Sequence, residues 1–252
     1  MPQFIVASTD IDRERCRGTL HGPEAKHCTA VARLRAGDLV LLTNGEGLRW
    51  QGVCTSAGVS QVDVEHLRPL AANEPKLYLE LLQGLPKGER WDGVLEKGTE
   101  LGVAMFRPLY TARSVPHISP PRLDKRLHRW REKLRAALKQ CERGRLPLLE
   151  KPVPLDCCLQ QLGPPEVGEL RLVLVERSIG DPWPDVDDIG TVRLAVGPEG
   201  GWDDEERQWL MDAGFRPLSL GPRILRTDTA ALAGSALIMQ RWGDLVSSGT
   251  RW

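Results

Sequence analysis

Two glycine-bearing segments near the end of the chain have the residue types and spacing of a small-molecule site. Residues 194–202 read LAVGPEGGW, and residues 220–229 read LGPRILRTDT. Glycine has no Cβ atom, so the backbone can approach a flat ligand and adopt conformations that other residues avoid. Each segment leads from a strand-like run into a helix-like run, and in parallel sheets ligands bind beyond the carboxyl ends of the strands. We therefore expect these segments to form two walls of one pocket.

Phosphate-binding motifs are missing from both segments. Neither contains the GxGxxG pattern of dinucleotide sites or the GxxxxGK[ST] pattern of triphosphate sites, which disfavours a nucleotide-dependent hydrolase. An alternative for the first segment is a tight strand-to-helix turn with Asp203 as the N-cap. In the second segment, Thr227 or Asp228 can cap the following helix. Arg226 and Asp228 can also form an ion pair at that helix N-terminus instead of taking part in chemistry.

The second part of the chain alternates strands and helices, which is the pattern of a mostly parallel sheet covered on both faces. Strands are expected at residues 77–82, 106–109, 170–175, 192–196 and 217–220. Helices are expected at residues 91–101, 122–141, 203–213 and 227–242. The last helix carries small residues that allow close packing, against another subunit or within its own domain: Ala230, Ala231, Ala233, Gly234 and Ala236.

The first third of the chain predicts a small β-rich domain. Strands are expected at residues 3–6, 38–43, 48–55 and 61–67, with a turn at residues 44–47. A helix at residues 23–34 would bury one stripe of side chains, namely Ala25, Cys28, Val31 and Leu34. Two prolines within residues 68–75 mark a linker. We therefore expect two domains, residues 1–72 and residues 73–252.

Charge is balanced overall but not along the chain. Lys plus Arg and Asp plus Glu are both 34, whereas residues 113–145 hold eleven basic and three acidic side chains. Most of the basic residues fall on the outward side of the helix expected at 122–141, so this face would attract RNA phosphates. A solvated basic face is the more usual explanation of such a run. The inward stripe of this helix comprises Leu123, Leu127, Trp130, Leu134, Ala137, Leu138 and Cys141, with Trp130 in the core.

Cysteine usage and the N-terminus favour a reduced cytoplasmic protein. The six cysteines form no CxxC pair and show no metal-ligand spacing, so no metal site is expected. The chain begins without a charged-then-apolar leader and contains no apolar run of about 18 residues, so we expect no association with a membrane.

Further motifs lie in order along the chain. Residues 85–90 read LPKGER, residues 97–103 read KGTELGV, and shorter matches occur at residues 112–114, 129–130 and 140–143. Together with the two glycine segments, these motifs resemble those of the bacterial 16S rRNA uridine-N3 methyltransferases, the RsmE type within the SPOUT superfamily. The patterns of that family include G-P-E-G-G-[FLW] and L-G-x-R-[IV]-L-R-x-E-T-A. The resemblance covers nearly the whole chain.

The resemblance implies an α/β fold: a SPOUT-type trefoil-knotted methyltransferase domain that follows an N-terminal β-rich, PUA-like RNA-binding barrel. It also implies a homodimer that binds S-adenosylmethionine in the knot and methylates N3 of a uridine in the decoding region of 16S rRNA, within the small ribosomal subunit. A cationic sulfonium needs no phosphate cradle. By carry-over, the cofactor would contact Gly197, Pro198, Glu199, Gly200, Gly201, Leu220, Gly221, Arg223, Ile224 and Leu225. RNA would contact Arg33, Arg35, Lys87, Arg122, Arg126 and Arg129.

Methylation at uridine N3 requires that N3 loses its proton. An acceptor close to N3, or a cation that stabilises the charge moving onto O2 or O4, would serve. The candidates are Arg226 and Asp228 beside the second glycine segment, and Glu100, Arg113, Gln140 and Arg143, from the same or the partner subunit. For Glu100, a solvent-exposed place at a helix end is the alternative.

Four positions depart from the family pattern. Asp228 stands where the family usually has Glu, and Ala112 replaces a common Glu. Lys139 and Glu142 stand where an acid and a glycine are usual. If these positions line the substrate entrance, target choice or rate would differ, while cofactor binding should survive because the glycine segments are intact. The alternative function is therefore a family relative that binds RNA or assembling ribosomes without efficient catalysis.

Overall fold

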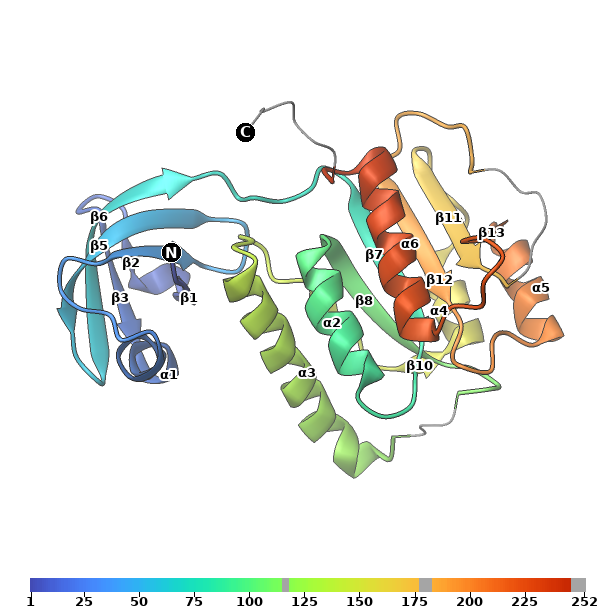
Figure 1. Ribbon diagram of the computed structural model, residues 1–252, viewed down its shortest axis with the longest axis horizontal. Coiled ribbons are helices and arrows are strands. Elements are labelled where there is room, and N and C mark those ends of the chain that lie inside the picture. Colours follow the sequence, from blue (N-terminus) through green and yellow to red (C-terminus); the bar gives the residue numbers. More distant parts are fainter. Residues whose placement is uncertain (115–117, 177–182, 246–252) are drawn as a thin grey trace. The chain divides into compact units, whose positions relative to one another are not determined.

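A computed structural model describes residues 1–114, 118–176 and 183–245 (Figure 1). Its contacts divide the chain into two compact units. Unit 1 comprises Met1–Glu74 and Arg135–Leu146, and unit 2 comprises Pro75–Leu134 and Pro147–Trp252. The domain boundary near residue 72 stays a prediction, and the units differ from it in one respect, because residues 135–146 cluster with the first unit.

Unit 1 is built on a mixed six-stranded sheet in the order β1-β4-β5-β6-β3-β2, in which only β1 and β4 pair in parallel. Alternating side chains such as Leu20, Val40, Leu42, Val62 and Val64 form its apolar core. The sequence predicted four of these strands and missed the short β2 and β3. The strands are β1 (Gln3–Ile5), β2 (Ile11–Asp12), β3 (Arg17–His21), β4 (Leu39–Thr43), β5 (Arg49–Ala57) and β6 (Gln61–Leu70).

The helix expected at residues 23–34 is interrupted. It consists of α1 (Gly22–Lys26) and a π-helical turn, η2 (His27–Val31). A π-turn contains one residue more than an α-turn, so the side chains after it rotate to another face. Ala25 and Cys28 are buried as predicted, whereas Val31 is 69% exposed. The prediction that Val31 belongs to the buried stripe was therefore wrong.

Unit 2 contains a seven-stranded sheet in which all described pairs are parallel. Its order is β10-β8-β7-β12-β11-β13, with β9 also pairing with β8. The mostly parallel sheet predicted from the strand and helix alternation is confirmed. The strands are β7 (Tyr78–Gly84), β8 (Val103–Tyr110), β9 (Leu148–Leu149), β10 (Val153–Pro154), β11 (Glu169–Leu174), β12 (Thr191–Val196) and β13 (Arg216–Leu218).

Helices cover both faces of this sheet. Helices α2 (Arg90–Glu100) and α6 (Thr227–Trp242) lie side by side on one face (Figure 1). On the other face, α4 (Leu155–Leu162), which the sequence missed, and α5 (Asp204–Asp212) pack with strand residues such as Leu82 and Ala195.

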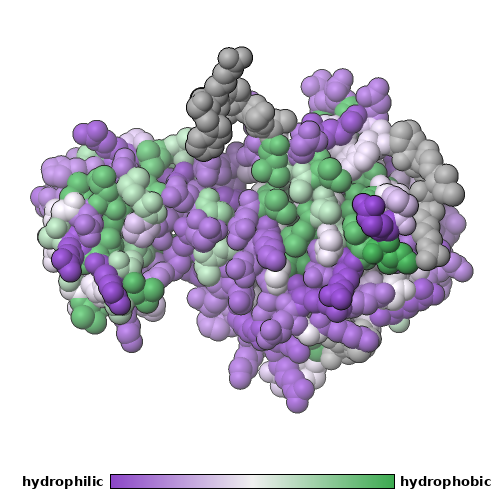
Figure 2. Space-filling view, viewed as in Figure 1, coloured by the Kyte–Doolittle hydropathy of each residue, from purple (hydrophilic) through white to green (hydrophobic). Residues whose placement is uncertain are grey.

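The small residues of α6 pack within unit 2. A Cβ atom at Gly234 would lie 3.0 Å from Leu194 Cδ2, so the absence of a side chain lets this helix approach the sheet closely. The other side of α6 carries exposed apolar surface, seen as green atoms in Figure 2, and Leu237 on this helix is 42% exposed. The chain reaches α6 from β13 at the edge of the sheet, and α6 then packs on β12 and β7. The trefoil knot implied by the resemblance stays a prediction.

Helix α3 (Pro120–Gln140) has the amphipathic pattern predicted from the sequence. Leu127, Trp130 and Leu134 are buried, whereas Leu123 and Cys141 at the two ends of the stripe are only partly buried. Trp130 meets Trp91 edge to face with ring centroids 6.0 Å apart, so it is a core residue, as expected. In the part of the chain that the structure describes, no helix combines the length and apolar character needed to cross a membrane.

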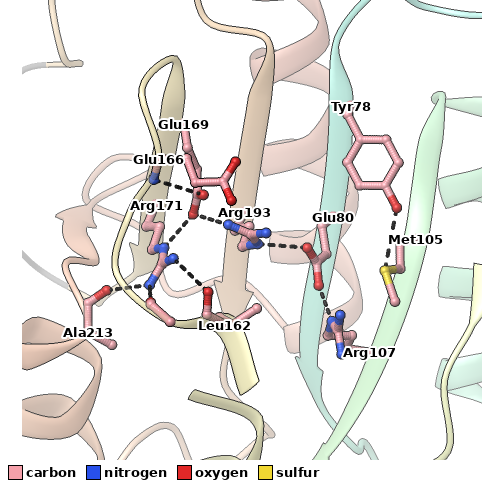
Figure 3. A network of polar contacts seen from close by, with 11 residues as sticks. Tyr78, Glu80, Met105, Arg107, Leu162, Glu166, Glu169, Arg171, Arg193 and Ala213 are labelled. Atoms are coloured by element: carbon pink, nitrogen blue, oxygen red, sulfur yellow. Dashed lines mark hydrogen bonds and ion pairs between the residues drawn. The ribbon is translucent and has the colours of Figure 1, made fainter. Parts of the chain in front are cut away.

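A chain of ion pairs crosses the sheet on the face covered by α4 and α5 (Figure 3). Glu80 accepts hydrogen bonds from Arg107 and from Arg193, the latter at 2.8 Å. Glu169 pairs with Arg193 and with Arg171, the latter at 2.5 Å. Arg171 is almost fully buried and also donates to carbonyl oxygens at the carboxyl ends of α4 and α5. These charged side chains therefore tie strands and helix ends together.

The ion pairs alter the acidity of Glu169. Burial by itself raises the pKa of this carboxyl, but the hydrogen bonds from Arg193 and Arg171 outweigh burial and hold the pKa below its ordinary value. The charged residues follow the period of two that defines a strand face, since each lies two positions before an apolar residue of the core under α4 and α5. These pairs are Glu80 and Leu82, Arg107 and Leu109, Arg171 and Val173, and Arg193 and Ala195.

Candidate functional site

A cavity of about 510 Å³ lies in unit 2 where β11 and β12 end. Its walls come from the segments after these two strands and from the segment between β13 and α6. All ten residues predicted to bind the cofactor line it, as do Arg113 and Arg226 from the predicted catalytic set. The remaining lining residues are Arg90, Leu174, Val175, Glu176, Val196, Trp202, Arg207, Thr227 and Ala230. The size suits a nucleoside-like ligand.

Two glycines permit the close approaches that shape the first wall. A Cβ atom at Gly84, the last residue of β7, would lie 2.6 Å from Pro198 Cδ, so any other residue would displace the loop after β12. A Cβ atom at Gly200 would lie 2.8 Å from the Cβ atom of Arg113. The loop at residues 197–202 can therefore pack this closely only because Gly84 and Gly200 have no side chains.

Charged and polar contacts also hold the loop at residues 197–202 in place. Glu199 accepts a hydrogen bond from the backbone N–H of Lys87 at 3.0 Å and forms an ion pair with Arg90. Arg113 Nη1 donates to the carbonyl oxygen of Gly200 at 2.9 Å. The motif at residues 85–90 thus contacts the glycine loop directly, and the side chain of Lys87 stays exposed.

A buried amide joins the two walls. Gln83, fully buried in β7, donates through Nε2 to Thr227 Oγ1 at 2.8 Å, and Thr227 Oγ1 donates to the carbonyl oxygen of Gly197 at 2.5 Å. The expectation that Thr227 or Asp228 caps α6 was wrong, because the N-cap residue is Arg226 and no side chain bonds there. Sequence reasoning missed Gln83, although an amide that follows the apolar pair Leu81 and Leu82 in a strand was a signal of a buried polar contact.

Helix α5 begins as predicted. Asp203 is its N-cap and forms a reciprocal capping box with Glu206. Glu206 Oε1 also accepts a hydrogen bond from the backbone N–H of Ala112 at 2.7 Å. The turn that carries Arg113 is thereby attached to the helix that follows the glycine loop.

The predicted catalytic residues of unit 2 occupy different surroundings. Arg226 lines the cavity. Asp228, in the first turn of α6, has a buried Oδ1 atom that meets no hydrogen-bond partner among the described residues. Between these two described side chains there is no ion pair, which removes the helix-end pair considered from the sequence. Glu100 is exposed at the end of α2 and is not among the residues that line the cavity.

Gln140 and Arg143 belong to unit 1. Gln140 is exposed at the end of α3, whereas Arg143 is buried and pairs with Glu74 at 2.7 Å. The neighbouring departure, Glu142, has φ of +58°, a conformation that favours the glycine usual in the family. Its carboxylate pairs with Arg49 at 3.4 Å. This part of the motif therefore contributes contacts within unit 1, and catalytic roles for Gln140 and Arg143 stay predictions.

Neither Lys139 nor Ala112 is among the residues that line the cavity. Lys139 pairs with Glu24 at 3.0 Å within unit 1, so this lysine does not belong to the outward basic face predicted for its helix. Ala112 is exposed, and it is its backbone N–H that bonds Glu206. Every residue type except proline has that N–H group.

The predicted RNA-binding residues lie on the surface of their units. Arg33 and Arg35 are exposed in unit 1, and Arg122 and Arg126 are exposed on α3. Arg129 is exposed on the same helix but forms an ion pair with Asp92 of α2. The side chain of Lys87, between β7 and α2, is exposed. The outward basic face of α3 is confirmed, and its contact with RNA stays a prediction.

Comparison with known proteins gives a consistent family. The model of an RNA methyltransferase domain matches residues 73–239, and that of an RNA methyltransferase PUA domain matches residues 20–65. The ribosomal RNA small subunit methyltransferase E of Mycobacterium bovis is 30% identical over 226 residues, which is 88% of this chain and 86% of the relative.

Solved structures agree over nearly the full length. That of a ribosomal RNA small subunit methyltransferase E from Neisseria gonorrhoeae bound to S-adenosyl methionine is 29% identical, with a TM-score of 0.85 over 98% of this chain and 100% of that one. That of a putative methyltransferase from Legionella pneumophila with bound cofactor SAM is 32% identical, with a TM-score of 0.86 over 97% and 99%. The chain therefore belongs to the RNA methyltransferase family that includes the ribosomal RNA small subunit methyltransferases E.

Proposed function

We propose that this protein is an S-adenosylmethionine-dependent rRNA methyltransferase that acts on N3 of a uridine in the decoding region of 16S rRNA, within the small ribosomal subunit. One observation carries the proposal. The ten residues assigned to the cofactor from motifs come from two separate segments of the chain, and all of them line the same cavity at the carboxyl ends of a parallel sheet. Two relatives with a similar structure over nearly their whole length carry this cofactor.

The cavity residues fit S-adenosylmethionine. Leu174, Leu220, Ile224 and Leu225 offer apolar surface for the flat adenine ring. The close approaches of Gly84 to Pro198 and of Gly200 to Arg113 hold the loop after β12 in place as one wall of the cavity. The bound cofactor would supply a methyl group that is already activated on a sulfonium. Holding this methyl group next to the substrate nitrogen accounts for much of the acceleration.

The protein must also help N3 to lose its proton. Arg113 and Arg226 place two guanidinium groups at the cavity, where they would stabilise negative charge on O2 or O4 of the uracil ring. Asp228 is not among the residues that line the cavity, but it lies in the first turn of α6 two positions after Arg226, which does, and its buried Oδ1 has no hydrogen-bond partner among the described residues. This oxygen therefore has an unused acceptor position for a proton. We assign the N3 proton to this carboxylate. N3 then takes the methyl group.

Both units would contribute to substrate recognition. We propose that residues 1–72 form the PUA-like RNA-binding domain and residues 73–252 the methyltransferase domain, in agreement with the two family models. Arg33 and Arg35 in unit 1, and Arg122, Arg126 and Lys87 in unit 2, offer exposed cations for phosphates. We further propose a homodimer, supported by large apolar side chains left exposed at Ile224 and Leu237.

Two measurements test the proposed function. Calorimetry with S-adenosylmethionine should show binding to the full-length protein. Small subunits from a strain that lacks the endogenous enzyme should then accept a methyl group, and the modified nucleotide can be mapped by reverse transcription, because a methyl group on N3 blocks base pairing. Cofactor binding without methyl transfer would favour the alternative function, an RNA-binding relative without efficient catalysis.

Asp228 provides the test of the mechanism. Asp228→Asn should keep cofactor affinity but lower kcat, since the amide cannot accept the N3 proton. General base catalysis contributes typically about 10²–10⁴-fold. Wild-type turnover of this variant would exclude Asp228 as the acceptor while leaving the methyltransferase assignment intact.

A further inference from the structure

We propose that Glu206 is a positioning residue that holds Arg113 in its place beside the cavity. Glu206 itself is not among the residues that line the cavity. This inference rests on the proposed function, because it assigns a role within the same site. Glu206 is 3% exposed, and each of its carboxylate oxygens accepts a hydrogen bond from the backbone. Oε1 accepts from the N–H of Ala112 at 2.7 Å, and Oε2 accepts from the N–H of Asp203 at 3.1 Å.

The two backbone groups belong to segments that face the cavity from different strands. Ala112 follows β8 and immediately precedes Arg113, and Asp203 follows the glycine loop at the end of β12. One carboxylate therefore links the turn that carries Arg113 with the end of the loop that would hold the cofactor. Arg113 completes the connection, since its guanidinium donates to the carbonyl oxygen of Gly200 at 2.9 Å.

The turn that carries Arg113 is internally rigid. The hydroxyl groups of Thr111 and Ser114 lie 2.8 Å apart, and the N–H of Ser114 bonds the carbonyl oxygen of Thr111 at 3.0 Å. Both residues are buried. A rigid turn moves as one piece, so its bond to Glu206, one residue before Arg113, sets the position of the arginine side chain.

A carboxylate is the group that this place requires. Both neighbours are N–H donors, and an ionised carboxylate offers only acceptors. In Glu206→Gln, the amide NH₂ group would face one of these donors, so one of the two links would be lost. The bond from the N–H of Ala112 to Glu206 is not needed to cap α5. The cap is already formed within residues 203–206, where Asp203 accepts the N–H of Glu206 at 2.8 Å.

The capping box supplies a matched control. Asp203→Ala removes the other half of the box but leaves both acceptor contacts of Glu206 in place. We expect Asp203→Ala and Glu206→Gln to lower the unfolding midpoint by similar amounts, about 2–4 °C each. Only Glu206→Gln should lower kcat/KM for the small subunit at saturating cofactor, by at least about tenfold, because misplacement of a positioning group costs up to about 10²-fold.

A double-mutant cycle with Arg113→Ala decides whether Glu206 acts through the arginine. If it does, Arg113→Ala combined with Glu206→Gln should lose no more activity than Arg113→Ala alone. Multiplicative losses, wild-type turnover of Arg113→Ala, or equal activity of Glu206→Gln and Asp203→Ala would each overturn the inference.

Hydrogen exchange gives a readout that does not depend on catalysis. In Glu206→Gln, the amide that faces the new NH₂ group, either that of Ala112 or that of Asp203, should exchange faster than in the wild type, whereas the amide of Ala112 should be unchanged in Asp203→Ala. Unchanged exchange of both amides in Glu206→Gln would also overturn the inference. A wild-type protein that transfers no methyl group contradicts the proposed function, and the exchange measurement still decides whether Glu206 holds the turn.

Discussion

The two ends of the parallel sheet in unit 2 use polar groups in opposite ways. Towards the amino ends of β7, β12 and β11, Glu80 and Glu169 each meet two guanidinium groups in a closed series of ion pairs (Figure 3). At the carboxyl ends, the chain presents glycine backbone and a cavity lined by five arginines, namely Arg90, Arg113, Arg207, Arg223 and Arg226. Four buried atoms without a hydrogen-bond partner among the described residues belong to this end or its adjoining helix: Gln83 Oε1, Trp202 Nε1, Asp228 Oδ1 and Ser235 Oγ. At the ion-paired end, Arg193 Nη1 also lacks a hydrogen bond of good geometry, but it lies in an ion pair with Glu169.

The polar groups at the amino ends of the strands stabilise the fold, whereas those at the carboxyl ends are available to a ligand. Buried charges that are saturated by one another keep a fixed geometry, and removing one partner leaves an uncompensated charge. Polar atoms that are left without a partner cost stability in the free protein and are retained where a ligand or a reaction uses them. The same strands serve both purposes because their amino and carboxyl ends are separated by apolar residues.

The largest expected effect comes from breaking the ion pairs near the amino ends of the strands. Glu80→Ala leaves Arg107 and Arg193 without this counter-charge, which should lower the free energy of unfolding by about 3–5 kcal/mol in a urea titration. The folded variant should still bind S-adenosylmethionine, because its cavity is untouched. Asp185→Ala is the control, since Asp185 is fully exposed in its pair with Arg241 and should give no measurable change. Equal losses in the two variants would refute the structural role of the network.

The second largest effect should come from a substitution at the cavity, at the carboxyl ends of the strands. Gly200→Val places side-chain atoms where even a Cβ atom would lie 2.8 Å from Arg113, so cofactor affinity in calorimetry should fall by about 2–3 kcal/mol while the fold persists. Gly93→Ala in α2 is the control, because a Cβ atom there meets nothing within 4 Å. Unchanged affinity in Gly200→Val would show that the cofactor binds elsewhere.

A smaller effect should follow from separating the two walls of the cavity. Thr227→Val removes the hydroxyl between Gln83 and Gly197, and the unpaired buried groups should weaken cofactor binding by about 1–2 kcal/mol. Thr227→Ser keeps the hydroxyl and should bind nearly as the wild type does. Thr229→Val changes an exposed threonine of the same helix and serves as the control. Loss of affinity in the serine variant as well would point to packing of the methyl group instead.

The smallest effect is a dependence of stability on pH. The pKa of Glu169 is lower in the folded protein than its ordinary value of 4.5, so the unfolded chain takes up the proton at a higher pH. Its contribution to stability is therefore complete above pH 4.5 and is lost as the pH falls through the folded pKa. The slope should stay below about 1.4 kcal/mol per pH unit, because one proton is involved. Glu169→Gln should reduce this slope in acid unfolding curves, and an identical slope would disprove the assignment.

The elements around the cavity were largely predictable because their signals are local. Asp203 follows a glycine loop and precedes a helical pattern with Glu206 three residues later, which is the spacing of a capping box. Trp130 falls on the apolar stripe of its helix and is buried. The prediction that Val31 is buried was wrong because the exposure of this residue depends on the π-turn at His27–Val31. The spacing of apolar residues does not reveal such a turn.

The contacts that organise the site were not predictable. Gln83 and Thr227 are 144 positions apart, and Ala112 and Glu206 are 94 positions apart, so nothing in either local pattern pairs them. The ion pairs of Glu80 with Arg107 and Arg193 likewise join three strands that are distant in sequence. Only the order of strands in the sheet brings these side chains together.

By itself, the sequence determined the alternation of strands and helices, the placement of glycine loops after β12 and β13, and the family resemblance carried by those loops. Each of these depends on neighbouring residues, through backbone conformation and through the periods of helices and strands. Tertiary structure alone decided that both loops line one cavity and that Glu206 reaches the turn of Arg113. It also decided that the charges of the opposite end neutralise one another. Such contacts form only when distant strands pair, because hydrogen bonds and ion pairs require atoms within a few ångströms of each other.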